Sequence, residues 1–287
     1  MHPIAFDPAA TDLRLPAPAK INLFLHIVGR RPDGYHLLQT AFRMLDWGDE
    51  IHLRCRTDGR ILRTTDVPGV APEADLVVRA ARALQQATGS TKGADIGVCK
   101  RIPMGGGLGG GSSDAATVLI ALNRMWGCNL PGQRLRELGL ALGADVPFFI
   151  FGETAFAEGV GEALQPLKVA PAWYVMVAPE VAVPTAEIFS AEELTRDTEP
   201  IIMRAFATHT TRNDMQPTVC RRFPEVAEAL VWLSQHGAAR MSGSGACIFA
   251  PFDSKEEADQ VAAAAPQGWV VWVASGLDRH PLQGWLV

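Results

Sequence analysis

One stretch of the chain, Met104–Ala116, is dominated by glycine: six glycines and two serines fill positions 105–113, interrupted only by Leu108. Glycine is needed where the backbone takes a positive φ or where a ligand approaches the main chain closely. The residues that follow, 116–126, predict an apolar helix, with Ser112 or Ser113 suited to its N-cap and Asp114 to its first turn. A glycine-rich loop that leads into a helix N-terminus presents free backbone N–H groups. This segment therefore predicts an anion site and favours phosphate.

Three known types of glycine loop fit the segment poorly. A Walker A loop requires Gly-Lys before Ser or Thr, and residues 104–121 contain no lysine. Gly105, Gly107 and Gly110 satisfy the dinucleotide pattern GxGxxG, but residues 127–132 offer no acidic side chain for a ribose. The chain also lacks the HRD and DFG motifs of protein kinases. A flexible linker stays open as an alternative, although a strand-like segment and an apolar helix flank the loop.

Composition indicates a soluble globular enzyme of two domains. The chain has 287 residues, of which 48% are apolar and 20% charged. Its net charge of −5, without a basic cluster, disfavours a nucleic-acid partner. The five cysteines are scattered and show no CxxC spacing, which favours a reducing compartment. With no signal-peptide pattern and no apolar stretch of membrane-spanning length, we expect a cytoplasmic protein without a membrane partner.

Hydrophobic patterning predicts an alternation of helices and strands. Strands are expected at 20–28, 148–151, 173–178, 246–249 and 269–274, with helices at 74–88, 133–142, 184–194, 225–235 and 254–265. Residues 1–15 are expected to form a loose leader, and RRPDGY at 30–35 a turn. Gly89 and Gly143 are expected to end their helices, Gly143 in the left-handed conformation. The pattern predicts an α+β fold in two halves, divided near 152–172.

Three segments together resemble the signature motifs of the GHMP kinases. They are PAKINLFL (Pro18–Leu25), PMGGGLGGGSSDAA (Pro103–Ala116) and MSGSGACIFA (Met241–Ala250). Three further blocks, Arg31–Thr40, Gly143–Glu162 and Pro184–Phe189, resemble the family members that act on a cytidine-diphosphate-linked methylerythritol. The similarity runs from about Leu15 to the C-terminus, and six blocks in order are far more specific than a glycine loop alone.

The resemblance implies a two-domain α+β fold with the active site between the domains. Residues 1–160 would form a ribosomal-S5-like, ATP-binding domain, and residues 161–287 a ferredoxin-like domain. The implied reaction uses ATP and Mg to phosphorylate the 2-hydroxyl of 4-diphosphocytidyl-2-C-methyl-D-erythritol in the non-mevalonate isoprenoid precursor pathway. Another small-molecule GHMP kinase, of the homoserine or mevalonate type, and a catalytically inactive nucleotide-binding regulator stay open. The sequence sets no oligomeric state.

By the same resemblance, Lys20 and Asp145 are the catalytic residues. Phosphoryl transfer has a loose transition state, so Asp145 would orient the hydroxyl and accept its proton late. Lys20 would pair with Asp145 and stabilise charge on the transferred group. Asn22, two residues along the same strand, is expected on the same face as Lys20. Without the resemblance, Asp145 could equally be an ordinary aspartate in a loop, and Lys20 an ordinary lysine on an edge strand. Because Val146 precedes a proline, we expect an extended backbone around Asp145.

The resemblance also implies contacts for both substrates. Tyr35 and Phe189 would stack on the two faces of cytosine, His36 would bond its edge, and Thr185 would lie near the diphosphate. The implied nucleotide contacts are Pro103, Met104, Gly105, Gly106, Gly107, Leu108, Gly109, Gly110, Gly111, Ser112 and Ser113, with Asp75, Leu76 and Lys100 at the adenine. Ser113 would reach the γ-phosphate or the magnesium. Relatives often carry Asn at the position of Asp75. The third motif, 243–246, would either brace the loop or only open a strand.

Overall fold

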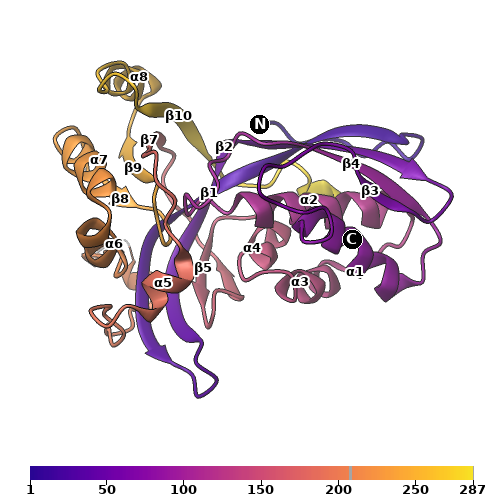
Figure 1. The fold of residues 1–287 in the computed structure, drawn as a ribbon, viewed down its shortest axis with the longest axis horizontal. Helices are drawn as coiled ribbons and strands as arrows, with labels where there is room; N and C mark the ends of the chain where they lie inside the picture. Colours follow the sequence, from indigo (N-terminus) through magenta and orange to yellow (C-terminus); the bar gives the residue numbers. More distant parts are fainter. Residues whose placement is uncertain (207–208, 287) are drawn as a thin grey trace.

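The structure, a computed structural model, describes residues 1–206 and 209–286. Its first half holds β1 (Asp12–Arg30), β2 (His36–Arg56), β3 (Ile61–Arg63), α1 (Leu76–Thr88), β4 (Gly93–Cys99), α2 (Gly110–Met125), α3 (Gly132–Leu140), α4 (Val146–Phe151), β5 (Ala155–Glu158) and β6 (Ala163–Pro166). The central strand β2 pairs along its length with β1, and on its other side with β4, β5 and β10. Helices α1–α4 lie together on one side of β2, β3 and β4 (Figure 1). Helix α2 packs directly on β1 and β2, so the segment before it reaches the sheet.

The second half is a four-stranded antiparallel sheet with helices. It holds β7 (Trp173–Ala178), α5 (Thr185–Ser190), a 3-10 turn (Met203–Ala205), α6 (Gln216–Arg222), α7 (Pro224–Ser234), β8 (Arg240–Met241), β9 (Ile248–Phe252), α8 (Lys255–Ala263), β10 (Val270–Leu277) and a 3-10 turn (Gln283–Trp285). The strand order is β10-β7-β9-β8, with α7 and α8 packed on the strands. Numbered along the chain this order is 4-1-3-2, the order of a ferredoxin-like βαββαβ unit.

The two halves share strands and core residues. Strand β10 pairs with both β2 and β7 and so joins the two sheets. The β1–β2 hairpin extends past β5 and α5 (Figure 1), and its Leu25 and Ile27 pack in the core of the second half. Leu282 and Trp285, near the C-terminus, pack in the core of the first half. The predicted α+β fold is confirmed, whereas the predicted division after residue 160 stays a prediction.

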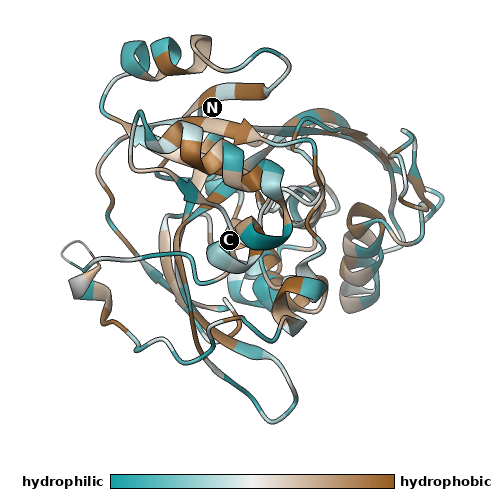
Figure 2. Ribbon diagram, turned by 60° about the vertical axis from the view of Figure 1, so that its left-hand side comes forward, coloured by the Kyte–Doolittle hydropathy of each residue, from teal (hydrophilic) through white to brown (hydrophobic). Residues whose placement is uncertain are grey.

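Most predicted elements are present, with shifted bounds. Gly89 ends α1 in the left-handed conformation, with φ of 66°, as expected. Strand β1 begins at Asp12, so the expected leader 1–15 is wrong in its last part. Helix α5 ends at Ser190 and is shorter than predicted. The helices mix hydrophilic and hydrophobic residues along their length (Figure 2). None of those in the described ranges 1–206 and 209–286 is long and apolar enough to cross a membrane.

Three local predictions near Asp145 are wrong. Residues 148–151 belong to helix α4, not to a strand, and Asp145 itself has helical dihedrals, φ −85° and ψ −14°. A proline usually keeps the residue before it out of the helical conformation. Pro147, however, lies in the first turn of α4, where a proline is tolerated because a backbone N–H at that position would have no partner within the helix. Gly143 does not take the left-handed conformation, and α3 ends instead at Leu140, with Ala141 as its C-cap in right-handed dihedrals.

Candidate active site

The two residues predicted to be catalytic lie side by side. Lys20 Nζ is 3.3 Å from Asp145 Oδ2 and donates a 2.6 Å hydrogen bond to Asn22 Oδ1. The lysine side chain is 4% exposed and the aspartate 31%, so the amine is buried while the carboxylate faces open space. Strand β1 supplies Lys20 and Asn22, and the start of α4 supplies Asp145. The expectation that Lys20 and Asn22 share a strand face is confirmed.

Asn22 is held in one orientation. Its amide nitrogen donates a 2.9 Å hydrogen bond to Thr40 Oγ1, and the Thr40 hydroxyl donates to the carbonyl of Phe24. Because the amide N–H group is taken up by Thr40, the amide oxygen is left to accept from Lys20. Thr40 lies on β2 opposite β1, and sequence reasoning missed it because that strand was not predicted.

The glycine loop lies directly against the lysine. The backbone N–H of Lys20 donates to the carbonyl of Leu108 at 3.0 Å. A Cβ at Gly109 would lie 3.1 Å from the Lys20 side chain, so only glycine fits here without displacement. Gly105, Gly107 and Gly109 all take positive φ, between 69° and 73°. Helix α2 begins at Gly110 with Gly109 as its N-cap, so the prediction of Ser112 or Ser113 as the cap is wrong.

The third motif braces this loop. Ser242 Oγ donates to the Gly107 carbonyl at 2.9 Å and accepts from the backbone N–H of Asn22 at 3.2 Å. The backbone N–H groups of Ala246 and Cys247 donate to the carbonyls of Gly105 and Gly106, each at 3.1 Å. Of the two alternatives for this motif, these contacts favour bracing. They also fix the loop relative to Lys20 through Asn22.

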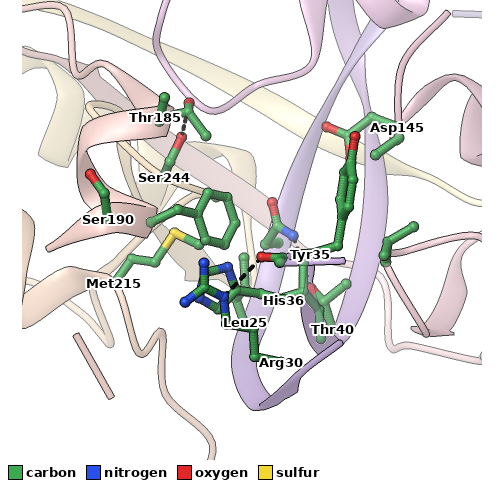
Figure 3. A pocket seen from close by; sticks show the side chains of 18 of the residues that line it. Leu25, Arg30, Tyr35, His36, Thr40, Asp145, Thr185, Ser190, Met215 and Ser244 are labelled. Carbon is green, nitrogen blue, oxygen red and sulfur yellow. Dashed lines mark hydrogen bonds between the residues drawn. The ribbon is translucent and has the colours of Figure 1, made fainter. Parts of the chain in front are cut away.

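A cavity of about 670 Å³ joins the Lys20–Asp145 pair to an aromatic cluster. The predicted residues that line it are Lys20, Asn22, Tyr35, His36, Asp145, Thr185 and Phe189. Figure 3 shows Asp145 and Thr40 on one side of it and Thr185, Ser190, Met215 and Ser244 on the other. The Thr185 and Ser244 hydroxyls lie 2.6 Å apart, linking α5 to the third motif. The structure thus gathers every residue predicted to bind the acceptor substrate into one space.

The aromatic groups are arranged differently from the expected pair. His36 stacks on Phe189, with ring centroids 4.9 Å apart and an interplanar angle of 22°. Tyr35 follows the β1–β2 turn and is 66% exposed, so its ring is free to cover a ligand. Burial, with a contribution from Arg196 and Arg30, lowers the pKa of His36, so its ring is neutral at pH 7.

The residues predicted at the adenine are engaged in structural contacts. Asp75 caps α1 by accepting from the N–H of Val77 at 3.1 Å, and it pairs with Arg63 at 2.8 Å. Both carboxylate oxygens of Asp75 are therefore used in contacts within the protein. Leu76 lies near the loop, since a Cβ at Gly111 would meet it at 3.4 Å.

Lys100 lies between two carboxylates at the base of the loop. Its amine pairs with Asp114 at 2.9 Å and with Asp49. Asp49 also accepts from the backbone N–H of Ile102 at 2.8 Å. Asp114 follows the first turn of α2 and binds Lys100, so its expected role at the helix N-terminus is wrong. Burial, together with the charge of Asp49, raises the pKa of Asp114 to about 7, against the opposing effect of Lys100. The cluster ties both ends of the loop together.

The loop fits a nucleotide triphosphate. The first N–H groups of a helix lack partners within it, and the loop glycines leave room for phosphates to approach them. Ser113 Oγ, in the same stretch of α2, is buried and has no hydrogen-bond partner among the described residues. Within residues 1–206 and 209–286 no three His, Cys, Asp or Glu side chains cluster as a metal cage.

Comparison with known proteins defines the family. Residues 75–153 match the GHMP kinases N terminal domain, and residues 201–271 match the GHMP kinases C terminal family. The chain is 62% identical over 271 residues to 4-diphosphocytidyl-2-C-methyl-D-erythritol kinase of Aromatoleum aromaticum, covering 94% of this chain and 95% of that protein. The chain belongs to the GHMP kinases. A protein of the same name from an Azoarcus species is 64% identical over 94% of this chain and 96% of its own length.

Solved structures show the same GHMP kinase fold. A crystal structure of 4-(cytidine 5'-diphospho)-2C-methyl-D-erythritol kinase matches with a TM-score of 0.80 and 33% identity, covering 92% of this chain and 99% of that one. Homoserine kinase from Cytophaga hutchinsonii matches with a TM-score of 0.68 at 15% identity, covering 96% and 98%. The second similarity concerns the fold alone. The expected two-domain GHMP kinase fold is therefore confirmed.

Proposed function

We propose that this GHMP kinase is a 4-diphosphocytidyl-2-C-methyl-D-erythritol kinase, which transfers the γ-phosphoryl group of ATP to the 2-hydroxyl of that substrate. One observation carries the proposal: a single cavity is lined by both the Lys20–Asp145 pair and the stacked His36–Phe189 pair. Such a cavity suits an acceptor with a flat base at one end and an alcohol at the other. Relatives at 62% and 64% identity carry the same name.

In the proposed reaction the polypeptide supplies positioning and charge. Asp145 accepts a hydrogen bond from the acceptor hydroxyl and takes its proton late, because little bond formation precedes breakage in a loose transition state. Lys20 holds that carboxylate in place and stabilises the negative charge on the transferred oxygens. The N–H groups of the loop 103–113 bind the phosphates of ATP. Mg²⁺ bound with ATP neutralises phosphate charge, and Ser113 is the residue we assign to it or to the γ-phosphate.

At the other end of the cavity, the aromatic residues bind cytosine. Tyr35 covers one face of the base and Phe189 the other, while His36 bonds its edge. Because His36 and Phe189 stack on each other in the structure, binding requires the Phe189 ring to turn away from His36, while His36 and the backbone of α5 stay in place. Thr185 and Ser244 provide hydroxyls for the diphosphate between the base and the reacting alcohol. A base pocket has no use in a kinase for homoserine or mevalonate.

We also propose that the enzyme works in the cytoplasm, in the isoprenoid precursor pathway, on a small-molecule partner. The five cysteines are free, as a reducing compartment would leave them. The presence of both Lys20 and Asp145 in contact disfavours an inactive regulator.

A coupled ADP-release assay tests the proposal. The purified enzyme is given ATP, Mg²⁺ and, separately, the cytidine-linked methylerythritol, homoserine and mevalonate. Turnover with the first substrate alone, and competition by cytidine diphosphate, is the expected result. Turnover with homoserine or mevalonate, or no competition by the cytidine nucleotide, would contradict it.

A further inference from the structure

Arg196 lies outside the cavity but makes direct contact with its aromatic wall. The guanidinium Nε–H donates to His36 Nε2 at 3.2 Å. The two residues are 160 positions apart and join the segment after α5 to the start of β2. Sequence analysis gave no reason to select this arginine, and the catalytic steps above do not use it.

The contact fixes which nitrogen of His36 carries the proton. A guanidinium has no lone pair to offer and stays charged at all working pH values, so His36 Nε2 must be the acceptor. The neutral ring then carries its proton on Nδ1. No described residue accepts a hydrogen bond from that nitrogen, while His36 lines the cavity. The ring is therefore held ready to donate one hydrogen bond to a ligand.

The same guanidinium secures the helix that carries Phe189. Its Nη2 donates to the carbonyls of Phe189 at 3.0 Å and Ala191 at 2.6 Å, and its Nη1 donates to the carbonyl of Leu194 at 3.0 Å. Helix α5 has six residues, and the carbonyls at its C-terminus lack partners within so short a helix. Arg196 donates the missing hydrogen bonds to these carbonyls, and it therefore positions both His36 and the backbone that carries Phe189.

We propose that Arg196 is a positioning residue for base recognition: it holds His36 as an Nδ1–H donor and locks α5 against the β1–β2 hairpin. This inference rests on the proposed function for its ligand, a pyrimidine base that offers hydrogen-bond acceptors at its O2 carbonyl and, in cytosine, at ring nitrogen N3. A ring of the opposite tautomer would present a lone pair to those acceptors and repel them. Selection of the base thus depends on a residue that does not touch it.

Two variants separate this role from simple anchoring of the loop. Arg196→Gln removes the Nε–H donor and most carbonyl contacts. Arg222→Gln is the matched control, because Arg222 holds the same segment through Glu193, at 2.9 Å, without reaching His36. Nitrogen-15 NMR of histidine-labelled protein reads the tautomer of His36 in the wild type, and steady-state kinetics reads KM and kcat for each variant.

The wild type is expected to show the proton of His36 on Nδ1. Arg196→Gln is expected to mix the two tautomers and to raise KM for the cytidine-linked substrate about tenfold, as loss of one hydrogen bond implies. Its kcat and its KM for ATP should stay close to those of the wild type, and Arg222→Gln should match the wild type throughout. A wild-type proton on Nε2, or equal KM values in the two variants, would overturn the inference. Failure of the wild type to phosphorylate the substrate would instead overturn the proposed function, since the NMR result does not depend on turnover.

Discussion

Replacement of Gly107 by alanine tests whether the glycine loop is held by backbone contact. A Cβ at this position would lie 2.1 Å from the carbonyl oxygen of Ser242, where about 3.0 Å is the closest approach real Cβ atoms make. Gly107 also has a φ of 73°, which L-residues adopt at a cost of about 1–2 kcal/mol. The loop and the third motif must therefore separate by about 1 Å, which also weakens the Ser242 hydrogen bond to Gly107.

The substitution should change both the stability of the protein and its activity. Strain and the lost contact together should lower the free energy of unfolding by about 3 kcal/mol. A displacement of about 1 Å at a phosphate-binding loop should reduce kcat/KM for ATP about 100-fold. Gly127→Ala is the matched control, because Gly127 has a φ of 74° and no atom within 4 Å of the added Cβ. It should lose only the strain, about 1–2 kcal/mol, and keep full activity.

Urea unfolding and the coupled ADP-release assay measure both quantities on the same preparations. If Gly107→Ala and Gly127→Ala lose equal stability and Gly107→Ala keeps the wild-type kcat/KM for ATP, close contact with Ser242 does not position the loop. The reasoning about the third motif would then be refuted.

Three further predictions concern single side chains. Asp145→Asn should lower kcat by about 10²–10⁴-fold, the range for loss of a general base, while ATP binding measured by calorimetry stays unchanged. Near-normal turnover would show that the Asp145 carboxylate is not the general base. Burial lowers the pKa of His280 to about 3, so its contribution to stability is present above about pH 6.5 and is lost on acidification, by about 2 kcal/mol near pH 5. In urea unfolding, His280→Asn should lose less stability between pH 7 and pH 5 than the wild type does. An identical loss would show that His280 does not cause the acid destabilisation. Asp75→Asn keeps the cap of α1 but leaves the buried Arg63 side chain, 3% exposed, with Asp66 at 3.7 Å as its one acidic partner among the described residues. It should lower the free energy of unfolding in urea by about 2 kcal/mol, whereas Asp66→Asn should change it little, and equal losses in the two variants would contradict this.

Local patterns predicted the parts of the site that depend on backbone chemistry. Glycine at positions 105–111 implied positive φ and close approach, and the structure has both. The alternation of β1 placed Lys20 and Asn22 on one face, and they share a hydrogen bond. These features follow from the residues themselves, so they can be read without knowing their distant neighbours.

Other features depend on contacts that local patterns do not contain. The apolar run 148–151 is too short to show a periodicity that would distinguish a strand from a buried helix. In the structure it forms helix α4, which packs against α2 and α3. Helix α2 starts earlier than a serine cap implies, because Gly109 bends the chain against Lys20 and Phe149. Arg196 and His36 are 160 positions apart, and nothing in the local sequence around either residue predicts that they are in contact.

The central claim is that the loop 103–113 binds the phosphates of ATP within reach of the Lys20–Asp145 pair. A crystal structure with a non-hydrolysable ATP analogue and the cytidine-linked substrate tests it most directly. We expect the triphosphate on the N–H groups at the start of α2, and the 2-hydroxyl between Asp145 and the γ-phosphate. A triphosphate bound elsewhere, or Lys20 and Asp145 drawn apart with the hydroxyl against neither, would contradict the account.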